Sequence, residues 1–287
     1  MPGRTGAWRT ARGDLPLDRP RILGVVNVTP DSFWDGGRHA GVDAALARAE
    51  TLLEEGADIL DVGGESTRPG AQPVPAAEEL RRVVPVVREI VRRWPDALVS
   101  VDTVKAEVAR AALAEGAAIL NDVSGLRLDP GLGRVAAEAG AGLILMHSRG
   151  DVAEMARYAT AQYGADPVAE IVDELTAATG RARDAGIADE AVVLDPGLGF
   201  SKRTEHSIAV LAQLDRIGAL GRPILIGPSR KRFVGEVAGG LPPEERLEGT
   251  LAACVVGLLG GARLFRVHDV GPARRALAVA EAVRRVR

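Results

Sequence analysis

Apolar runs rich in β-branched residues recur eight times along the chain, and polar residues follow each of them. Such runs are typical of strands buried on both faces. They cover residues 22–26, 59–62, 98–101, 118–120, 143–146, 192–194, 224–226 and 264–265. Helical spacing of apolar residues fills the intervals, at residues 44–55, 77–94, 105–115, 132–139, 167–185, 205–217, 245–259 and 272–286. The pattern therefore predicts eight strand–helix units in succession.

Eight such units predict an α/β fold, a single (β/α)₈ TIM barrel, which typically needs roughly 250 residues. The chain has 287, so we expect one barrel domain at residues 21–287. Residues 1–20 show no periodicity and are expected to be a lead-in on the surface.

Glycines 56, 116, 140, 186 and 261 follow helical segments, where a left-handed residue commonly ends a helix. Two strand-to-helix loops, 28–38 and 63–73, are unusually long. An open doubly wound sheet is less compatible, because no Gly-x-Gly-x-x-Gly follows the first run.

In a (β/α)₈ barrel the carboxyl ends of the strands meet at one mouth, where active sites are built. The polar residues that end the runs are Asn27, Thr67, Arg68, Asp102, Asn121, Asp195, Lys231, Arg266 and His268. Two carboxylates, an amide and a lysine can satisfy a flat heterocycle with N–H donors and a carbonyl. Arg266 and His268, with Asn27 on the adjacent first strand, suit a polyanion. The alternatives are that the aspartates cap helices and that residues 229–232 form a solvated basic turn.

Composition excludes some classes of function. The net charge of −3 gives no sign of a nucleic-acid surface. No apolar run reaches the ~18 residues of a membrane span. The lone cysteine, Cys254, excludes an internal disulfide and favours the cytoplasm. Segment 249–259 is apolar nearly all round, which predicts a second subunit over this helix; the alternative is a helix covered by its own neighbours.

Several motifs together resemble the dihydropteroate synthase family over residues 21–287. They are 27–33 (NVTPDSF), 63–70 (GGESTRPG), 100–103 (SVDT), 121–125 (NDVSG), 195–200 (DPGLGF), 229–231 (SRK) and 266–270 (RVHDV). The resemblance implies a homodimeric barrel that condenses 6-hydroxymethyl-7,8-dihydropterin pyrophosphate with p-aminobenzoate, with Mg²⁺, giving 7,8-dihydropteroate and pyrophosphate.

The resemblance also implies roles for individual residues. Asp102, Asp195 and Lys231 would be catalytic, and the pterin would be held by Asp102, Asn121, Met146, Asp195 and Lys231. Pyrophosphate would be bound by Asn27, Thr67, Arg266 and His268, and the metal by Asn27 and Asp35. Phe33, Thr67, Arg68, Pro69, Phe200 and Lys231 would frame p-aminobenzoate. The chain departs from the family's common pattern at Trp34, Ser148 and Ser201-Lys202-Arg203, all beside the expected site.

Two rival functions remain open at this point. A methyltransferase that passes a methyl group from a reduced folate to a corrinoid would share a pterin pocket but would not need the pyrophosphate residues. An inactive paralogue that senses a pterin or a partner should have lost at least one pterin or phosphate residue. Every residue of both sets is present here, which favours the synthase.

Overall fold

The centre of the molecule is a closed barrel of parallel strands. The computed structural model describes residues 6–28, 37–66 and 72–286. Its strands are β3 (Arg21–Asn27), β4 (Ile59–Gly63), β5 (Leu98–Asp102), β6 (Ile119–Asp122), β7 (Gly142–Met146), β8 (Val192–Asp195), β9 (Leu225–Ile226) and β10 (Leu264–Val267). They pair in the order β8-β7-β6-β5-β4-β3-β10-β9, and a bridge from Leu194 to Ile224 joins the two ends. The predicted (β/α)₈ barrel and its eight strands are confirmed.

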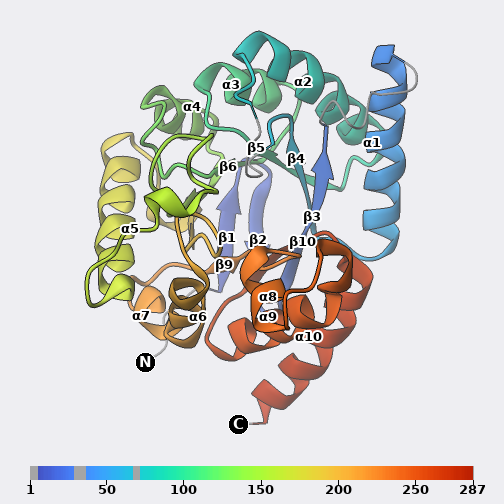
Figure 1. Ribbon diagram of the computed structural model, residues 1–287. Helices are drawn as coiled ribbons and strands as arrows, with labels where there is room; N and C mark the ends of the chain where they lie inside the picture. The colour runs from blue at the N-terminus through green and yellow to red at the C-terminus, as the bar shows by residue number, and fades with distance from the viewer. Residues whose placement is uncertain (1–5, 29–36, 67–71, 287) are drawn as a thin grey trace.

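Helices surround the barrel (Figure 1). They are α1 (Gly37–Glu54), α2 (Ala76–Arg93), α3 (Ala106–Ala114), α4 (Gly131–Ala139), α5 (Pro167–Asp184), α6 (Thr204–Ala212), α7 (Leu214–Gly218), α8 (Arg232–Val237), α9 (Leu247–Leu259) and α10 (Val270–Arg285). Short 3₁₀ turns are η2 (Tyr158–Thr160), η3 (Asp189–Ala191) and η4 (Pro243–Glu245). The helix predicted over 205–217 is divided at Gln213 into α6 and α7. Helix α8 was not predicted, because six residues are too few to show a helical period.

The five glycines predicted to follow helices all have positive φ, between 60° and 105°. Gly140, for example, is the left-handed cap of α4, and its amide donates to carbonyls of the last turn. Only glycine adopts a left-handed conformation at this position with little cost in free energy, because it has no Cβ atom. These glycines therefore end their helices sharply and let the chain enter the next strand after a short loop.

The barrel is packed on both sides of its strands. Outward residues such as Val26, Leu60 and Leu120 belong to the large core shared with helix residues such as Leu52 and Val87. A second core fills the inside of the barrel at one end and takes residues from nearly every strand. Its buried members are Trp8, Leu17, Leu23, Ile59, Ala118, Ile119, Ile144, Val193, Leu225 and Leu264. We call this second core the apolar floor.

The N-terminal segment differs from the expected surface lead-in. Strands β1 (Ala7–Thr10) and β2 (Gly13–Pro16) form an antiparallel hairpin, which lies inside the ring of helices in Figure 1. Trp8 is fully buried in the apolar floor, and its Nε1 donates to the carbonyl of Ala191 at 2.8 Å. A hairpin of four-residue strands offers too short a pattern to predict. Its physical role is to close one end of the barrel with an aromatic side chain.

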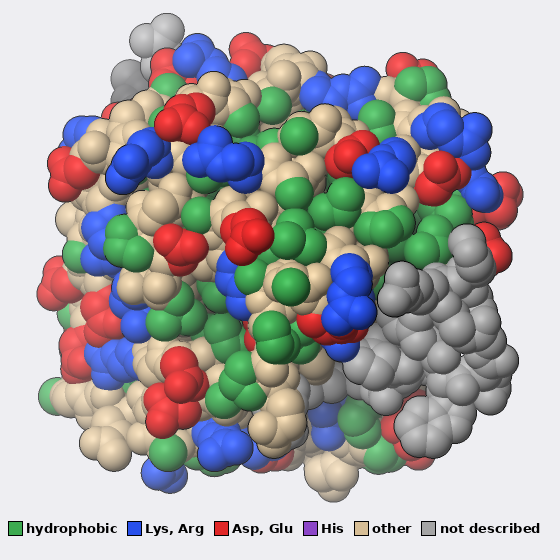
Figure 2. All heavy atoms as spheres, turned by 90° about the horizontal axis from the view of Figure 1, so that it is seen from above, with side chains coloured by type: hydrophobic (Ala, Val, Ile, Leu, Met, Phe, Trp, Pro, Cys, Tyr) green, Lys and Arg blue, Asp and Glu red, His purple; other side chains and the backbone are tan. Residues whose placement is uncertain are grey.

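The surface carries mixed charge. On the face that shows α2 and α3, basic and acidic side chains lie next to one another (Figure 2). Arg88 of α2, for example, pairs with Glu115 at 2.7 Å, and Arg92 pairs with Glu89 at 2.8 Å. Exposed pairs of this kind contribute little stability each. Within the described ranges, no helix has the length and apolar character needed to cross a membrane.

Trp8 provides a test of the closing role of the hairpin. Trp8→Ala should lower the free energy of unfolding by roughly 3–5 kcal/mol, the usual cost of deleting a buried aromatic side chain. Trp8→Phe keeps most of the ring volume, loses one hydrogen bond and should cost only about 1 kcal/mol. The midpoints of urea unfolding measure both effects. An Ala variant that unfolds at the wild-type urea concentration would show that the hairpin does not hold the barrel together.

Candidate active site

A layer of polar side chains lies directly above the apolar floor, one step of the strand period away. Side chains two residues apart in a strand point to the same face. Ile59 of the floor is therefore followed by Asp61, Ile119 by Asn121, and Leu264 by Arg266. The full set two residues beyond the floor is Val25, Asp61, Ser100, Asn121, Met146, Asp195, Gly227 and Arg266. Asp102 and His268 lie one further step toward the strand ends.

Arg266 connects the polar layer from one side of the barrel to the other. Its Nε donates to Asp61 Oδ2 at 2.6 Å, and its Nη2 donates to Asp102 Oδ2 at 2.8 Å. Asn121 Nδ2 also donates to Asp61 Oδ2, at 3.2 Å. Arg266 was expected among the pyrophosphate residues. The structure places it deeper, as the shared partner of two carboxylates.

The two carboxylates around Arg266 compete for one positive charge. Burial raises the pKa of Asp102 to about 7; Arg266 opposes this shift, and the neighbouring Asp61 adds to it. Burial lowers the pKa of Arg266, but Asp61 and Asp102 more than compensate and raise it above its usual range. The guanidinium therefore stays charged, and Asp102 is poised to change its protonation state near neutral pH.

Asp195 and Lys231 form the second charged group of the layer. Asp195 is buried, and its Oδ1 accepts from the amide of Gly197 at 2.7 Å. Burial raises the pKa of Asp195, although Lys231 acts in the opposite direction. Burial likewise lowers the pKa of Lys231 to about 8, opposed by Asp195. Lys231 Nζ donates to the carbonyl of Leu198 and lies 4.1 Å from the centre of the Phe200 ring, a cation–π distance.

An apolar shelf lies beside these charges. Met146 is buried with Val104, Val123 and Met155, and Phe200 packs against this cluster. Apolar walls with a few placed polar groups are typical of small-molecule sites. The arrangement suits a flat ring that stacks on apolar atoms and presents its edge to carboxylates.

The remaining predicted residues lie at the rim or outside the described ranges. His268 Nδ1 lies 2.9 Å from Ser229 Oγ, which also accepts from the His268 amide. Asn27 ends β3, is exposed, and is paired in register with Gly63. Five of the predicted site residues lie outside the described ranges: Phe33, Asp35, Thr67, Arg68 and Pro69. Trp34, noted above as a departure from the family's pattern, also lies outside them.

Two residues of the site were not identified from the sequence. Asp61 lies inside an apolar run, whereas the predicted site residues follow the ends of such runs. Because side chains two residues apart in a strand point to the same face, its spacing from Ile59 indicates that Asp61 points into the barrel. The sequence marks Lys202 only as part of the run Ser201-Lys202-Arg203, which departs from the family's common pattern. It is 1% exposed, and its Nζ lies 2.7 Å from His147 Nδ1. No sequence pattern shows that so polar a side chain is buried.

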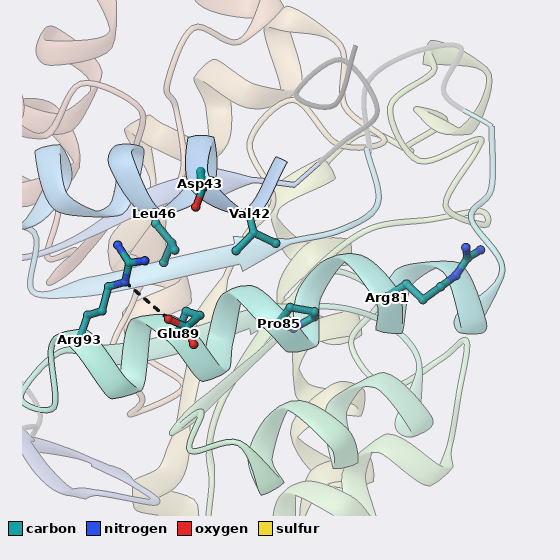
Figure 3. A pocket seen from close by; sticks show the side chains of 7 residues that line it. All are labelled: Val42, Asp43, Leu46, Arg81, Pro85, Glu89 and Arg93. Atoms are coloured by element: carbon teal, nitrogen blue, oxygen red, sulfur yellow. Dashed lines mark ion pairs between the residues drawn. The ribbon is translucent and has the colours of Figure 1, made fainter. Parts of the chain in front are cut away.

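A hollow elsewhere on the surface is not the site. A groove of about 580 Å³ lies between α1 and α2. Figure 3 shows Val42 and Leu46 facing Pro85 across it. Its charges, such as Glu89 and Arg93, belong to the outer faces of helices. The residues that line this groove all belong to helices and not to strand ends. The groove therefore lacks the converging polar groups found at the barrel mouth.

Comparison with known proteins identifies the family of the chain. The family model described as pterin binding enzyme matches residues 23–268. The dihydropteroate synthase of Escherichia coli is 42% identical over 268 residues, which are 93% of each chain. The solved dihydropteroate synthase of Xanthomonas albilineans with 4-aminobenzoic acid is 47% identical, with a TM-score of 0.89, and the match covers 97% of this chain and 98% of that one. A second structure from that organism, in complex with 7,8-dihydropteroate, has a TM-score of 0.84 at 42% identity, covering 96% and 98%.

The fold and the polar layer thus define a pterin-binding enzyme of the barrel type. Within that class, the chain belongs to the dihydropteroate synthase family.

Asp102→Asn should raise the thermal unfolding midpoint at about pH 8. Because the pKa of Asp102 is raised in the folded chain to about 7, ionised Asp102 disfavours folding, and stability falls as the pH rises from roughly 4 to 7. A neutral amide does not titrate, so the gain should shrink toward about pH 5. Asp96→Asn, on the exposed surface, is the control and should change neither midpoint. A lower midpoint for Asp102→Asn at about pH 8 would show that the pair with Arg266 outweighs burial.

Proposed function

We propose that the chain condenses 6-hydroxymethyl-7,8-dihydropterin pyrophosphate with p-aminobenzoate to give 7,8-dihydropteroate and pyrophosphate. The observation that carries this proposal is the polar layer at the barrel mouth, with Asp102, Asn121, Asp195 and Lys231, beside an apolar shelf that contains Met146 and Phe200. Relatives of the same fold are bound to 4-aminobenzoic acid and to 7,8-dihydropteroate, which supports both substrates. The activity belongs to folate synthesis and makes the chain a transferase.

The pterin would be recognised by its hydrogen-bonding edge. Asp102 and Asp195 would accept from its N–H groups, and Asn121 can both donate and accept. Lys231 would donate to its carbonyl or ring nitrogen, and Met146 would pack against its face. Buried partners of this kind discriminate strongly, because an analogue that lacks one group leaves a buried polar atom unpaired.

The reaction needs no nucleophile from the protein. The C–O bond to pyrophosphate breaks first, and its electron pair leaves with the pyrophosphate. The electron-rich dihydropterin stabilises the resulting cation, and the aniline nitrogen of p-aminobenzoate then forms the new C–N bond and loses a proton. Asp102 and Asp195, fixed in a largely buried site, would favour the positive charge of that intermediate. Asp102, Asp195 and Lys231 are therefore the proposed catalytic residues.

The p-aminobenzoate pocket would form against Phe200 and Lys231, whose ring and ammonium already lie 4.1 Å apart. Phe33, Thr67, Arg68 and Pro69 are proposed to complete it on the basis of the resemblance.

Pyrophosphate would be bound at the rim by Asn27, Thr67 and His268, with Arg266 below them. The described residues contain no group of three or more His, Cys, Asp or Glu that could hold a metal. Mg²⁺ commonly uses one or two protein oxygens together with substrate phosphates and water, so the amide oxygen of Asn27 and the carboxylate of Asp35 fit a substrate-borne ion. When bound, Mg²⁺ would stabilise the negative charge of the departing pyrophosphate.

We also propose a homodimer in the cytoplasm. Helix α9 presents Val256 and Leu259 to solvent at 47% and 43% exposure, which supports a second copy of the chain over this face. The lone, buried Cys254 agrees with a reducing compartment.

A direct assay tests the proposed function. The pure protein, incubated with the pterin pyrophosphate, p-aminobenzoate and Mg²⁺, should form dihydropteroate, detected by chromatography and mass spectrometry. Omission of p-aminobenzoate is the control. Binding of the pterin with no dihydropteroate formed would instead support an inactive pterin sensor.

Asp102→Asn should keep the fold and lose most turnover. The substitution is isosteric but removes a negative charge that would face the developing cation. Losing one preorganised electrostatic contact typically costs ~3–4 kcal/mol of barrier, roughly 10²–10³ in kcat. Steady-state kinetics measures the effect, and the surface variant Asp96→Asn is the control. A kcat within about threefold of wild type, only ~0.65 kcal/mol, would remove Asp102 from the catalytic residues.

A further inference from the structure

Lys202 has a buried amine for which the reaction above has no use, and burial lowers the pKa of this amine well below the usual value for lysine. It lies in the loop between β8 and α6, and only 1% of it is exposed. Burying a lysine without a paired carboxylate is costly. Within the described residues, Lys202 forms no ion pair; its Nζ contacts His147 Nδ1 at 2.7 Å and the carbonyl of Phe200 at 3.1 Å. The free-energy cost of burying Lys202 suggests that its side chain has a function in the candidate site.

His147 determines the direction of these hydrogen bonds. Its Nε2 lies 3.0 Å from Glu174 Oε2, and Arg149 Nε donates to the other oxygen of Glu174 at 2.9 Å. Burial lowers the pKa of His147 to about 4; burial raises the pKa of Glu174, but His147 and Arg149 outweigh it and lower that pKa to about 2. Neutral His147 therefore carries its proton on Nε2 and accepts from Lys202 at Nδ1. Lys202 is thus tied through His147 to α5.

The loop that Lys202 holds is the one that places Lys231. The carbonyl of Leu198 accepts from Lys231 Nζ, and the Phe200 ring lies 4.1 Å from the same atom. Lys202 binds the carbonyl of Phe200 itself. A shift of this carbonyl would therefore move both the ring and the ammonium.

Ser201 fixes the same loop from a second direction. Its backbone is left-handed, with φ of 47°, an uncommon conformation for a residue with a side chain. Its Oγ accepts from the amide of Arg149 and donates to the carbonyl of Arg149, both at 2.8 Å. Its own amide donates to the carbonyl of Met155 at 2.5 Å. The segment after Phe200 is thus anchored to the loop that follows β7, at Arg149 and at Met155.

We propose that Lys202 is a positioning residue for p-aminobenzoate: by tying the Phe200 carbonyl to His147, it holds the ring of Phe200 and the ammonium of Lys231 in place for the second substrate. This inference rests on the proposed function. Lys202 does not contact the reacting atoms, so it acts through these two residues. Lys231 is also a proposed pterin contact, but the pterin would keep its four other contacts, Asp102, Asn121, Met146 and Asp195, so its binding should be affected much less than that of p-aminobenzoate.

Lys202→Met, which keeps the length of the side chain without its amine, separates the two substrates. The KM for p-aminobenzoate should rise about tenfold, as expected for the loss of one or two buried hydrogen bonds. The KM for the pterin pyrophosphate should stay within about twofold. A residue that only supports the fold would lower the active fraction and leave both KM values unchanged. Ser201→Ala should act in the same direction more weakly, and it carries the test if Lys202→Met does not fold.

Chemical rescue supplies the second readout. Lys202→Ala should recover a low KM for p-aminobenzoate in n-propylamine, which can occupy the vacated space, but not in tert-butylamine, which is too wide. An unchanged KM for p-aminobenzoate in both Lys202→Met and Ser201→Ala, or an equal rise for both substrates, would overturn the proposal. The wild-type chain assayed in parallel separates the outcomes: if it forms no dihydropteroate, the proposed function fails rather than the role of Lys202.

Discussion

One guanidinium between two carboxylates organises the interior of this barrel. Arg266 comes from β10, Asp61 from β4 and Asp102 from β5, and their contacts of 2.6 and 2.8 Å span the mouth. A buried charge cluster is stable only when its partners are held in good geometry. The closed sheet provides that geometry, because each residue stands at a fixed register beside its neighbours. With two negative charges and one positive charge, the site favours a further positive charge, which agrees with a cationic intermediate.

The residues that stabilise the barrel and the residues of the candidate site lie only two positions apart along the same strands. Leu23, Ile59, Ile144 and their neighbours form the apolar floor with Trp8, and the next inward residues are polar. Floor residues can be exchanged for others of similar volume at modest cost. The layer above it has less freedom, since its charged and polar side chains serve as one another's partners. The floor therefore supports the site without taking part in it.

The fold and much of the candidate site can be predicted from periodic patterns in the sequence. Strands, helix ends and the polar residues after each strand follow from alternation, helical spacing and glycines such as Gly140, because these are local rules. The elements that could not be foreseen depend on tertiary contacts. The hairpin is too short to show a pattern, and Trp8 is buried only because the open end of the barrel receives it. Asp61 was recoverable from its spacing to Ile59. Lys202 was not, since its burial results from the loop after β8 folding back toward His147.

The polar layer also indicates why substrates should matter to the stability of the chain. Asp61 Oδ1 and Ser100 Oγ are buried without a hydrogen-bond partner within the described part of the structure. Each such atom costs roughly 1–3 kcal/mol. The raised pKa of Asp102 is a further sign that burial of its charge is only partly compensated. A ligand with several N–H donors would offer hydrogen bonds to this layer, so its buried polarity would make it selective for a pterin.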